Sequence, residues 1–380
     1  MERMGIKSVK YVKDLFTLIC YLGLLATMFP SVGQAKPEKS PIRKCWSHPA
    51  AILPSAGIAA DKAYAYYVSS NGVLHSIDVN SGDSVWTTEV GGEVKSPLLV
   101  GKRSIVLISS GTPTETGKTS AAYLRSISPL SGITNWRVEL PAAENYLAGV
   151  TDHGIAVVSS RTEIITFDEL DGSIKWKTAA KDGQIIAPDI SARQIAVATN
   201  GNHLELYDSA DGKMVTSIRL QFPPIAMGLY GDSTAIVSND RGGLFSIDRE
   251  DSGQNWKFKA GGRVTQIRLV GGNVLAASAD NFVYFISAET GNVIWKRRLP
   301  GRIASVTEIG NDALAVTVVG EPAAYIINTH EGKLEDHIRL TGEDDFLLAT
   351  IAADNSVIIA LTTNGISGYS SVCEQEKSGK

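Results

Sequence analysis

"SIDVNSGDSVW", residues Ser76–Trp86, combines alternating apolar and polar residues, a polar turn that contains Gly82, and a final tryptophan. The alternation predicts a β-strand, and the turn that follows predicts a hairpin. The same frame recurs at Ser126–Trp136, Thr166–Trp176, Leu206–Thr216, Ser246–Trp256, Phe285–Trp295 and Ile326–Asp336. The motif is therefore a period of the chain rather than a single site.

The last position of this frame sets the length of the period. It is occupied by all six tryptophans of the chain, at positions 46, 86, 136, 176, 256 and 295, and by Thr216 and Asp336 in the two remaining units. Successive positions are 39 to 41 residues apart, except for a step of 50 residues between Trp86 and Trp136. A period of about 40 residues with four short apolar runs is typical of a four-stranded propeller blade.

The two ends of the chain complete one another in this pattern. The segment around Trp46 resembles a fourth strand without its first three, whereas residues 346–371 supply three strands without a fourth. We therefore predict an all-β, eight-bladed β-propeller of four-stranded antiparallel blades over residues 42–376, closed by the N-terminal strand and followed by a tail, residues 377–380. Closure of the ring protects sheet edges from pairing with other molecules.

Two of the three cysteines flank the predicted closure. Cys45 precedes Trp46, and Cys373 follows the last strand, so the ring brings both to the gap in the eighth blade. A disulfide between them would close a very long loop and stabilise the ring by about 4–5 kcal/mol on the chain-entropy model. The alternative is a pair of unlinked surface thiols.

The N-terminus resembles a secretory signal. Three lysines precede an apolar run, Leu15–Met28, and the sequence VGQA ending at Ala35 fits a cleavage site. We expect residues 1–35 to be a signal peptide cleaved after Ala35, residues 36–41 to be a linker, and the mature protein to be periplasmic or secreted without a membrane span. A lipoprotein modified at Cys20 and an uncleaved anchor are the alternatives.

Composition is that of a soluble domain: 43% of the residues are hydrophobic and 20% are charged. Removal of residues 1–35 changes the formal net charge from −4 to −6. Such a charge disfavours nucleic acid and anionic lipid as partners.

The strand, polar turn with glycine, and final tryptophan of SIDVNSGDSVW and FISAETGNVIW resemble the tryptophan-docking repeat of the pyrroloquinoline-quinone-type propellers. The resemblance covers nearly all of the mature chain. It implies that each tryptophan packs against the turn of the neighbouring blade, which gives a structural role to Trp46, Trp86, Trp136, Trp176, Trp256 and Trp295. Thr216 and Asp336 depart from the pattern, so we expect those two junctions to be packed more loosely or differently.

The same resemblance limits the functions to be considered. The family includes quinone-dependent dehydrogenases, many with adjacent cysteines and a calcium site, and non-catalytic scaffolds such as the propeller lipoprotein of the outer-membrane β-barrel assembly machinery. This chain has no adjacent cysteine pair and is similar to that lipoprotein in length, blade count and export. We expect a non-catalytic scaffold without a cofactor, monomeric within a larger assembly, that binds protein partners in the cell envelope. The alternatives are an enzyme that uses pyrroloquinoline quinone and calcium in the central channel, and a carbohydrate- or polymer-binding propeller.

The remaining sequence motifs give little support for a catalytic, nucleotide-binding or metal site. GTPTETGKTS, Gly111–Ser120, resembles a phosphate-binding loop, but its glycines enclose five residues instead of four and the next segment reads as a strand. We interpret it as a long loop between the second and third strands of the second blade, where a partner would be contacted. No catalytic motif and no metal-ligand spacing is found.

Any small-molecule site is expected in the axial channel, which the first strand of each blade lines. The polar candidates for this channel are Lys95, Gln184, Arg263, Gln266, Arg302, Asp344 and Asp345. A water-filled channel in which these residues are merely solvated is the alternative.

Overall fold

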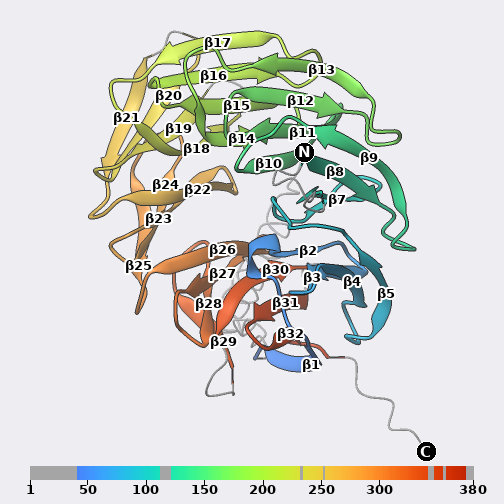
Figure 1. Cartoon of the computed structure of the whole chain (residues 1–380). Helices are drawn as coiled ribbons and strands as arrows, with labels where there is room; N and C mark the ends of the chain where they lie inside the picture. The colour runs from blue at the N-terminus through green and yellow to red at the C-terminus, as the bar shows by residue number, and fades with distance from the viewer. Residues whose placement is uncertain are drawn as a thin grey trace, which may run out of the picture. The chain divides into compact units, whose positions relative to one another are not determined.

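The computed structural model describes residues 41–111, 121–231, 234–250, 253–340, 346–353 and 357–373. The predicted signal peptide, nearly all of the linker and the C-terminal tail lie outside these residues. Within them, the chain forms eight sheets of four antiparallel strands arranged as a ring (Figure 1). The predicted fold, an eight-bladed all-β propeller, is confirmed.

The first four blades follow one another along the chain, and a 3-10 helix, η1 (Pro54–Ala56), precedes them. Their strands are β2 (Ile58–Ala60), β3 (Tyr64–Val68), β4 (Val73–Asp78) and β5 (Ser84–Glu89) in blade 1; β6 (Leu99–Val100), β7 (Ile105–Ser110), β8 (Ala122–Ile127) and β9 (Thr134–Leu140) in blade 2; β10 (Tyr146–Thr151), β11 (Gly154–Ser159), β12 (Glu163–Phe167) and β13 (Ile174–Ala179) in blade 3; and β14 (Ile185–Ile190), β15 (Gln194–Thr199), β16 (His203–Asp208) and β17 (Met214–Arg219) in blade 4.

The last four blades repeat this order until the C-terminus. Their strands are β18 (Pro224–Tyr230), β19 (Thr234–Asn239), β20 (Gly243–Asp248) and β21 (Gln254–Lys259) in blade 5; β22 (Val264–Val270), β23 (Asn273–Ser278), β24 (Phe282–Ser287) and β25 (Val293–Arg298) in blade 6; β26 (Ile303–Ile309), β27 (Ala313–Val318), β28 (Ala323–Asn328) and β29 (Leu334–Arg339) in blade 7; and β30 (Leu347–Ala352), β31 (Val357–Thr362), β32 (Gly365–Ser370) and β1 (Arg43–Pro49) in blade 8.

The hydrophobic core lies between neighbouring blades rather than at one centre. Second strands such as β7 and β31 are buried along their whole length, because each is covered by a blade on both faces. Fourth strands such as β13 alternate between exposed and half-buried residues. One apolar cluster joins blades 6 and 7, and another joins blades 2 and 3. Each blade therefore depends on its neighbours for stability.

The tryptophans join each blade to the next one. Every indole N–H donates a hydrogen bond to a backbone carbonyl in the turn between the third and fourth strands of the following blade. The pairs are Trp46 with Val79 (2.8 Å), Trp86 with Pro129 (2.9 Å), Trp136 with Glu169 (2.9 Å), Trp176 with Ser209 (3.0 Å), Trp256 with Ala288 (2.8 Å) and Trp295 with Thr329 (2.6 Å). One side chain thus repeats the same contact at six of the eight junctions.

A glycine in each receiving turn makes room for the indole. Gly132, for example, has a φ of +71°, and a Cβ atom placed on it would lie 2.5 Å from Cε3 of Trp86. The turns that receive the other tryptophans contain Gly82, Gly172, Gly212, Gly291 and Gly332 in the same relation. Glycine is required here both for the left-handed backbone and for the close approach of the ring.

Alanine substitutions at two glycines can separate the effect of the left-handed backbone from the effect of the close approach of the indole. Gly132→Ala is expected to destabilise the protein by about 3 kcal/mol, because backbone strain and a clash with the indole add up. Gly320→Ala is the matched control: its φ is +73°, but no atom lies within 4 Å of the added Cβ. This control should lose only about 1 kcal/mol. Denaturant unfolding measures both losses, and equal losses would show that the indole does not restrict the turn.

The two junctions without tryptophan use polar ties. In blade 5, the glycine of the receiving turn stands one position later, at Gly253, so the blade that follows Thr216 lacks the usual docking glycine. There the buried side chain of Arg249 donates from Nη1 to Gln194 Oε1 in blade 4 and from Nη2 to the Gly231 carbonyl at 3.3 Å. The bond to Gln194 links blades 4 and 5 without an indole, and the bond to Gly231 holds the guanidinium in place within blade 5.

Asp336 ties blade 7 to the strand that closes the ring. Its Oδ2 atom accepts a hydrogen bond of 2.7 Å from the backbone N–H of Ile42, immediately before β1. An indole at position 336 would have no covalent turn to dock on, because the third and fourth strands of blade 8 come from opposite ends of the chain. The carboxylate instead holds the start of the closing strand.

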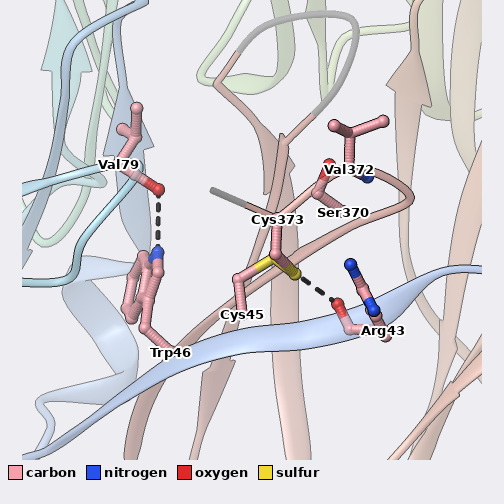
Figure 2. The surroundings of a disulfide bond; sticks show 7 residues. All are labelled: Arg43, Cys45, Trp46, Val79, Ser370, Val372 and Cys373. Carbon is pink, nitrogen blue, oxygen red and sulfur yellow. Dashed lines mark hydrogen bonds between the residues drawn. A yellow bond between two sulfur atoms is a disulfide. The ribbon is translucent and has the colours of Figure 1, made fainter. Parts of the chain in front are cut away.

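The ring closes between the two ends of the described chain. Strand β1 pairs antiparallel with β32, and a disulfide joins Cys45 to Cys373 with their Cα atoms 5.3 Å apart. Figure 2 shows this disulfide beside Trp46, whose indole donates to the Val79 carbonyl of blade 1. The predicted disulfide is present, and it links the closing strand to the segment that follows β32.

Candidate functional site

The wall of the central channel is formed by the first strand of each blade. These strands lie at the inner end of each sheet, and neighbouring ones contact each other, as β14 contacts β18 and β18 contacts β22. Each of them leaves one backbone edge without a partner strand in its own sheet. Side chains from these strands therefore determine how neighbouring blades are joined along the channel. They also determine which polar and apolar groups line it.

Five of the seven residues predicted for the channel lie within the described part of the chain, in two groups. Lys95, Gln184, Arg263 and Arg302 stand before β6, β14, β22 and β26, on the loops that lead into the channel wall. Lys95 is held there by an ion pair of 2.6 Å between its Nζ and Glu93 Oε2. Gln266 lies on β22 itself. Asp344 and Asp345 lie outside the described residues.

An open cavity of about 370 Å³ lies on the channel wall across blades 4, 5 and 6. Its apolar lining comes from β14, β18 and β22. It is completed by four polar residues: Asp189 from β14, and Thr265, Gln266 and Arg268 from β22. Of the residues predicted for the channel, Gln266 is the one that lines this cavity. Asp189 and Arg268 were missed, although each is a charged residue in a mainly apolar first strand.

Three side chains on the wall bond to the backbone of the next blade. Asp189 Oδ2 accepts from the Leu229 N–H at 2.9 Å, Gln266 Nε2 donates to the Ala304 carbonyl at 2.8 Å, and Thr307 Oγ1 donates to the Thr350 carbonyl at 2.6 Å. Each bond satisfies a backbone group that the edge of a first strand leaves unpaired. These side chains therefore join the first strands of neighbouring blades. Two of them, Asp189 and Gln266, also line the cavity.

The pKa of Asp189 is raised above its ordinary value because burial disfavours the charged carboxylate. The N–H bonds from Leu229 and Ile190 and the positive charge of Arg268 act in the opposite direction but do not cancel the effect of burial. Asp189 in the folded protein consequently binds a proton more readily than Asp189 in the unfolded chain. The stability that this provides is present at low pH and is lost as pH rises through the raised pKa.

Asp189→Asn is expected to remove this dependence. An amide oxygen still accepts from the Leu229 N–H, but no charge is buried. The unfolding free energy of the variant relative to the wild type should therefore rise from about pH 4 to about pH 7. Asp83→Asn, which removes a carboxylate from an exposed turn, controls for the change in net charge. A difference between Asp189→Asn and wild type that stays constant with pH would contradict the assignment.

The cavity combines a carboxyl group, a guanidinium, an amide and an apolar floor. Such a set suits a small polar ligand or the main chain of a peptide. In the part of the chain that the structure describes, no three His, Cys, Asp or Glu side chains are grouped so as to hold a metal ion. Nor does any helix among these residues have the length and apolar character of a membrane span.

The long loop of blade 2 lies where the sequence predicted it, between the second and third strands of that blade. Strands β7 and β8 on either side of it pair in register from Ile105 with Ile127 to Ser110 with Ala122. Residues 112–120 of the loop lie outside the described residues. Because β8 is a strand, the helix that a phosphate-binding loop requires is absent from this position.

Comparison with known proteins assigns the chain to a family. The family model described as "Outer membrane protein assembly factor BamB" matches residues 39–117, 120–221 and 219–365. The chain belongs to this family. The matched BamB segments extend over blades 1 to 7 and reach into β32 of blade 8.

Individual relatives are distant. A BamB from Yersinia pestis is 24% identical over 140 residues, which cover 32% of this chain and 35% of the relative. The chain thus matches about a third of the length of that BamB. The crystal structure of BamB from Moraxella catarrhalis has a TM-score of 0.63 and 16% identity, and the match covers 89% of this chain and 99% of that one.

Other propellers are similar in fold alone. The computationally designed protein Ika8 has a TM-score of 0.69 at 12% identity, covering 86% of this chain and 98% of that chain. The C-terminal WD40 domain of Sif2 has a TM-score of 0.68 at 11% identity, covering 87% and 98%. These structural similarities show only that the proteins share the propeller architecture. The assignment to the BamB family rests on the match between the family model and this sequence.

Proposed function

We propose that this chain is an exported, non-catalytic scaffold that binds a protein partner during the assembly of outer-membrane proteins. The observation that carries the proposal is the match of the BamB family model across nearly the whole propeller. The disulfide between Cys45 and Cys373 supports export, since such bonds persist in oxidising compartments such as the periplasm. The chain acts as a monomer within a larger assembly.

The function is tested by deleting the gene in the bacterium that encodes the protein. Heat-modifiable mobility on gels distinguishes folded from unfolded outer-membrane β-barrels, and the amount of the folded form is expected to fall. A plasmid copy of the full chain should restore it. Unchanged amounts of folded β-barrels in the deletion strain would contradict the proposal.

The location is tested on the same complemented strain. We expect the protein in the periplasmic fraction, with a mature N-terminus at Lys36, so that the mature chain lacks Cys20 and carries no acyl chain. Mass spectrometry of the purified protein gives both the position of the mature N-terminus and the mass of any attached acyl chain. A mass that includes acyl chains on Cys20 would instead assign a lipoprotein.

The absence of a cofactor requirement is part of the same proposal. Purified protein supplied with pyrroloquinoline quinone and calcium is expected to show no dye-linked oxidation of alcohols. Turnover under these conditions, lost on removal of calcium, would favour an enzyme that uses the channel.

A further inference from the structure

Positive charge is concentrated in one part of the ring. Residues 253–302, which form the outer strand of blade 5 and nearly all of blade 6, contain eight Lys or Arg residues and two Asp or Glu residues, a net charge of +6. The whole chain has a net charge of −4. This part of the surface is therefore opposite in sign to the rest of the molecule.

Six exposed cations form what we call the basic band. Two lie on the outer strand β21, two on the outer strand β25, and two on the loops that lead from these strands to the channel wall. They are Lys257, Lys259, Lys296, Arg298, Arg263 and Arg302. Among the residues that the structure describes, no carboxylate oxygen lies within ion-pair distance of any of them. Lys259 Nζ donates a hydrogen bond to the Arg241 backbone carbonyl, which does not neutralise its charge, so the positive charges of the band are available to a partner.

Aromatic rings support the cations from below. Lys257 Nζ lies 5.4 Å from the centroid of the Phe245 ring, and Lys296 Nζ lies 5.6 Å from that of Phe282. Phe258 of blade 5 packs edge-on against Tyr284 of blade 6, with centroids 5.2 Å apart. Cation–π contacts of this kind restrict the lysine side chains before a partner arrives, which lowers the entropic cost of binding.

Few acidic groups oppose the band. Asp280, on the loop between β23 and β24, accepts hydrogen bonds from the Tyr284 hydroxyl at 2.6 Å and the Phe282 N–H at 3.1 Å. Glu289 lies at the other end of blade 6, in the turn that receives Trp256. Asp240 and Glu321 stand on the corresponding loops of blades 5 and 7. The cations on the outer strands themselves have no acidic residue beside them on the same strand.

Protection of sheet edges alone does not account for the band. Lysine on an edge strand discourages unwanted pairing, but that need is equal in all blades, and the outer strand β5 (SVWTTE) has no cation at all. Strand β25 (VIWKRR) has three consecutive cations next to exposed Val293 and Ile294. The outer strand β13 of blade 3 (IKWKTA) also has two lysines, but Lys175 forms an ion pair of 3.0 Å with Asp168, whereas within the described part of the chain the cations on β21 and β25 are in no such pair.

We propose that the basic band binds an extended acidic segment of a protein partner. Lys257 and Lys259, like Lys296 and Arg298, are two residues apart on a strand, which is about 7 Å along its axis. An extended segment with an acidic residue at every second position has the same spacing. A membrane surface fits less well, because the aromatic rings here are buried or half-buried beneath the cations and do not project for insertion.

This inference rests on the proposed function for its choice of a protein as partner, and it is tested without cells. The probe is a labelled twelve-residue peptide of alternating Glu and Thr, and its binding to the purified mature chain is followed by fluorescence anisotropy. We expect binding that weakens steeply when salt is raised from about 50 to about 200 mM. A peptide with the same composition but with its six Glu residues in one block should bind more weakly.

The matched variants remove equal charge from equivalent strands. Lys296→Gln with Arg298→Gln is expected to weaken peptide binding about five- to tenfold. The control is Lys175→Gln with Lys177→Gln on the outer strand β13 of blade 3, which should leave binding within about twofold. Circular dichroism of both double variants checks that the ring is intact.

Three outcomes would overturn the inference. They are equal weakening by both double variants, equal binding of the two peptides, and binding to phosphatidylglycerol vesicles in preference to either peptide. None of these outcomes bears on the amounts of folded outer-membrane proteins in the deletion strain. The inference and the proposed function therefore fail independently.

Discussion

Trp295→Ala is expected to lower the free energy of unfolding by about 3–5 kcal/mol. The indole of Trp295 is 8% exposed, stacks on Phe285 with centroids 5.0 Å apart, and donates to the Thr329 carbonyl of blade 7. Its removal leaves a cavity between blades 6 and 7 and an unpaired carbonyl. Equilibrium unfolding in guanidinium chloride, followed by intrinsic fluorescence, measures the loss.

The chain contains a matched control for this variant. Thr216 occupies the equivalent position in blade 4, so Thr216→Ala changes the same site of the repeat without removing an indole. We expect it to cost less than about 1 kcal/mol. Trp295→Phe, which keeps a ring but loses the N–H bond, should fall between the two. A Trp295→Ala variant no less stable than Thr216→Ala would show that the indole does not hold the blades together.

Loss of the disulfide is expected to have the second large effect. The double variant Cys45→Ser with Cys373→Ser should be less stable than the wild type by about 2–5 kcal/mol, because the bond restricts the unfolded chain across a separation of 328 residues. The midpoint of denaturant unfolding measures the difference. Proteolysis should also become faster within β1, since this strand is then retained by non-covalent contacts alone: its ladder with β32, the Trp46 indole and the bond from Ile42 to Asp336.

A reducing agent provides the control for this variant. Wild-type protein in excess dithiothreitol is expected to reach the stability of the double variant, while the double variant itself is unaffected. If reduction destabilised both proteins equally, the effect would not arise from this bond. If it changed neither, ring closure by β1 would be sufficient without the bond.

The indole contacts and the disulfide explain how eight blades that are not stable on their own form one stable ring. A blade alone has no buried core, since its apolar clusters are shared with its neighbours. Six indoles and two polar ties connect neighbouring blades, and one disulfide joins the two ends of the chain within blade 8. The faces and the outer edge of such a ring are free to carry binding residues without a cost to the core.

Much of this fold could be predicted from sequence because its determinants are local and repeated. The alternation within a strand, the glycine of the turn and the tryptophan lie within eleven residues, and their period shows the number of blades. The disulfide was predictable for the same reason, since counting strands placed Cys45 and Cys373 at the same gap. The candidate site was predicted only in part, with Gln266 on the cavity wall and Asp189 and Arg268 missed.

The missed residues have a physical explanation. β-Bulges near the starts of β14 and β22, between Ile185 and Ala187 and between Val264 and Gln266, shift the alternation of side chains along each strand. Neither strand therefore has a strict alternation from which its channel-facing residues could be assigned.

The sequence by itself determined the unit, its number and the way in which the ring is closed, because these follow from contacts within a hairpin or from a repeated spacing. Only the tertiary structure decided what different blades bring together: the tie from Arg249 to Gln194 and the placement of Asp189 and Arg268 around one cavity. These pairs are separated by a blade or more along the chain. Their proximity depends on the angle and register at which whole sheets pack, which no local pattern specifies.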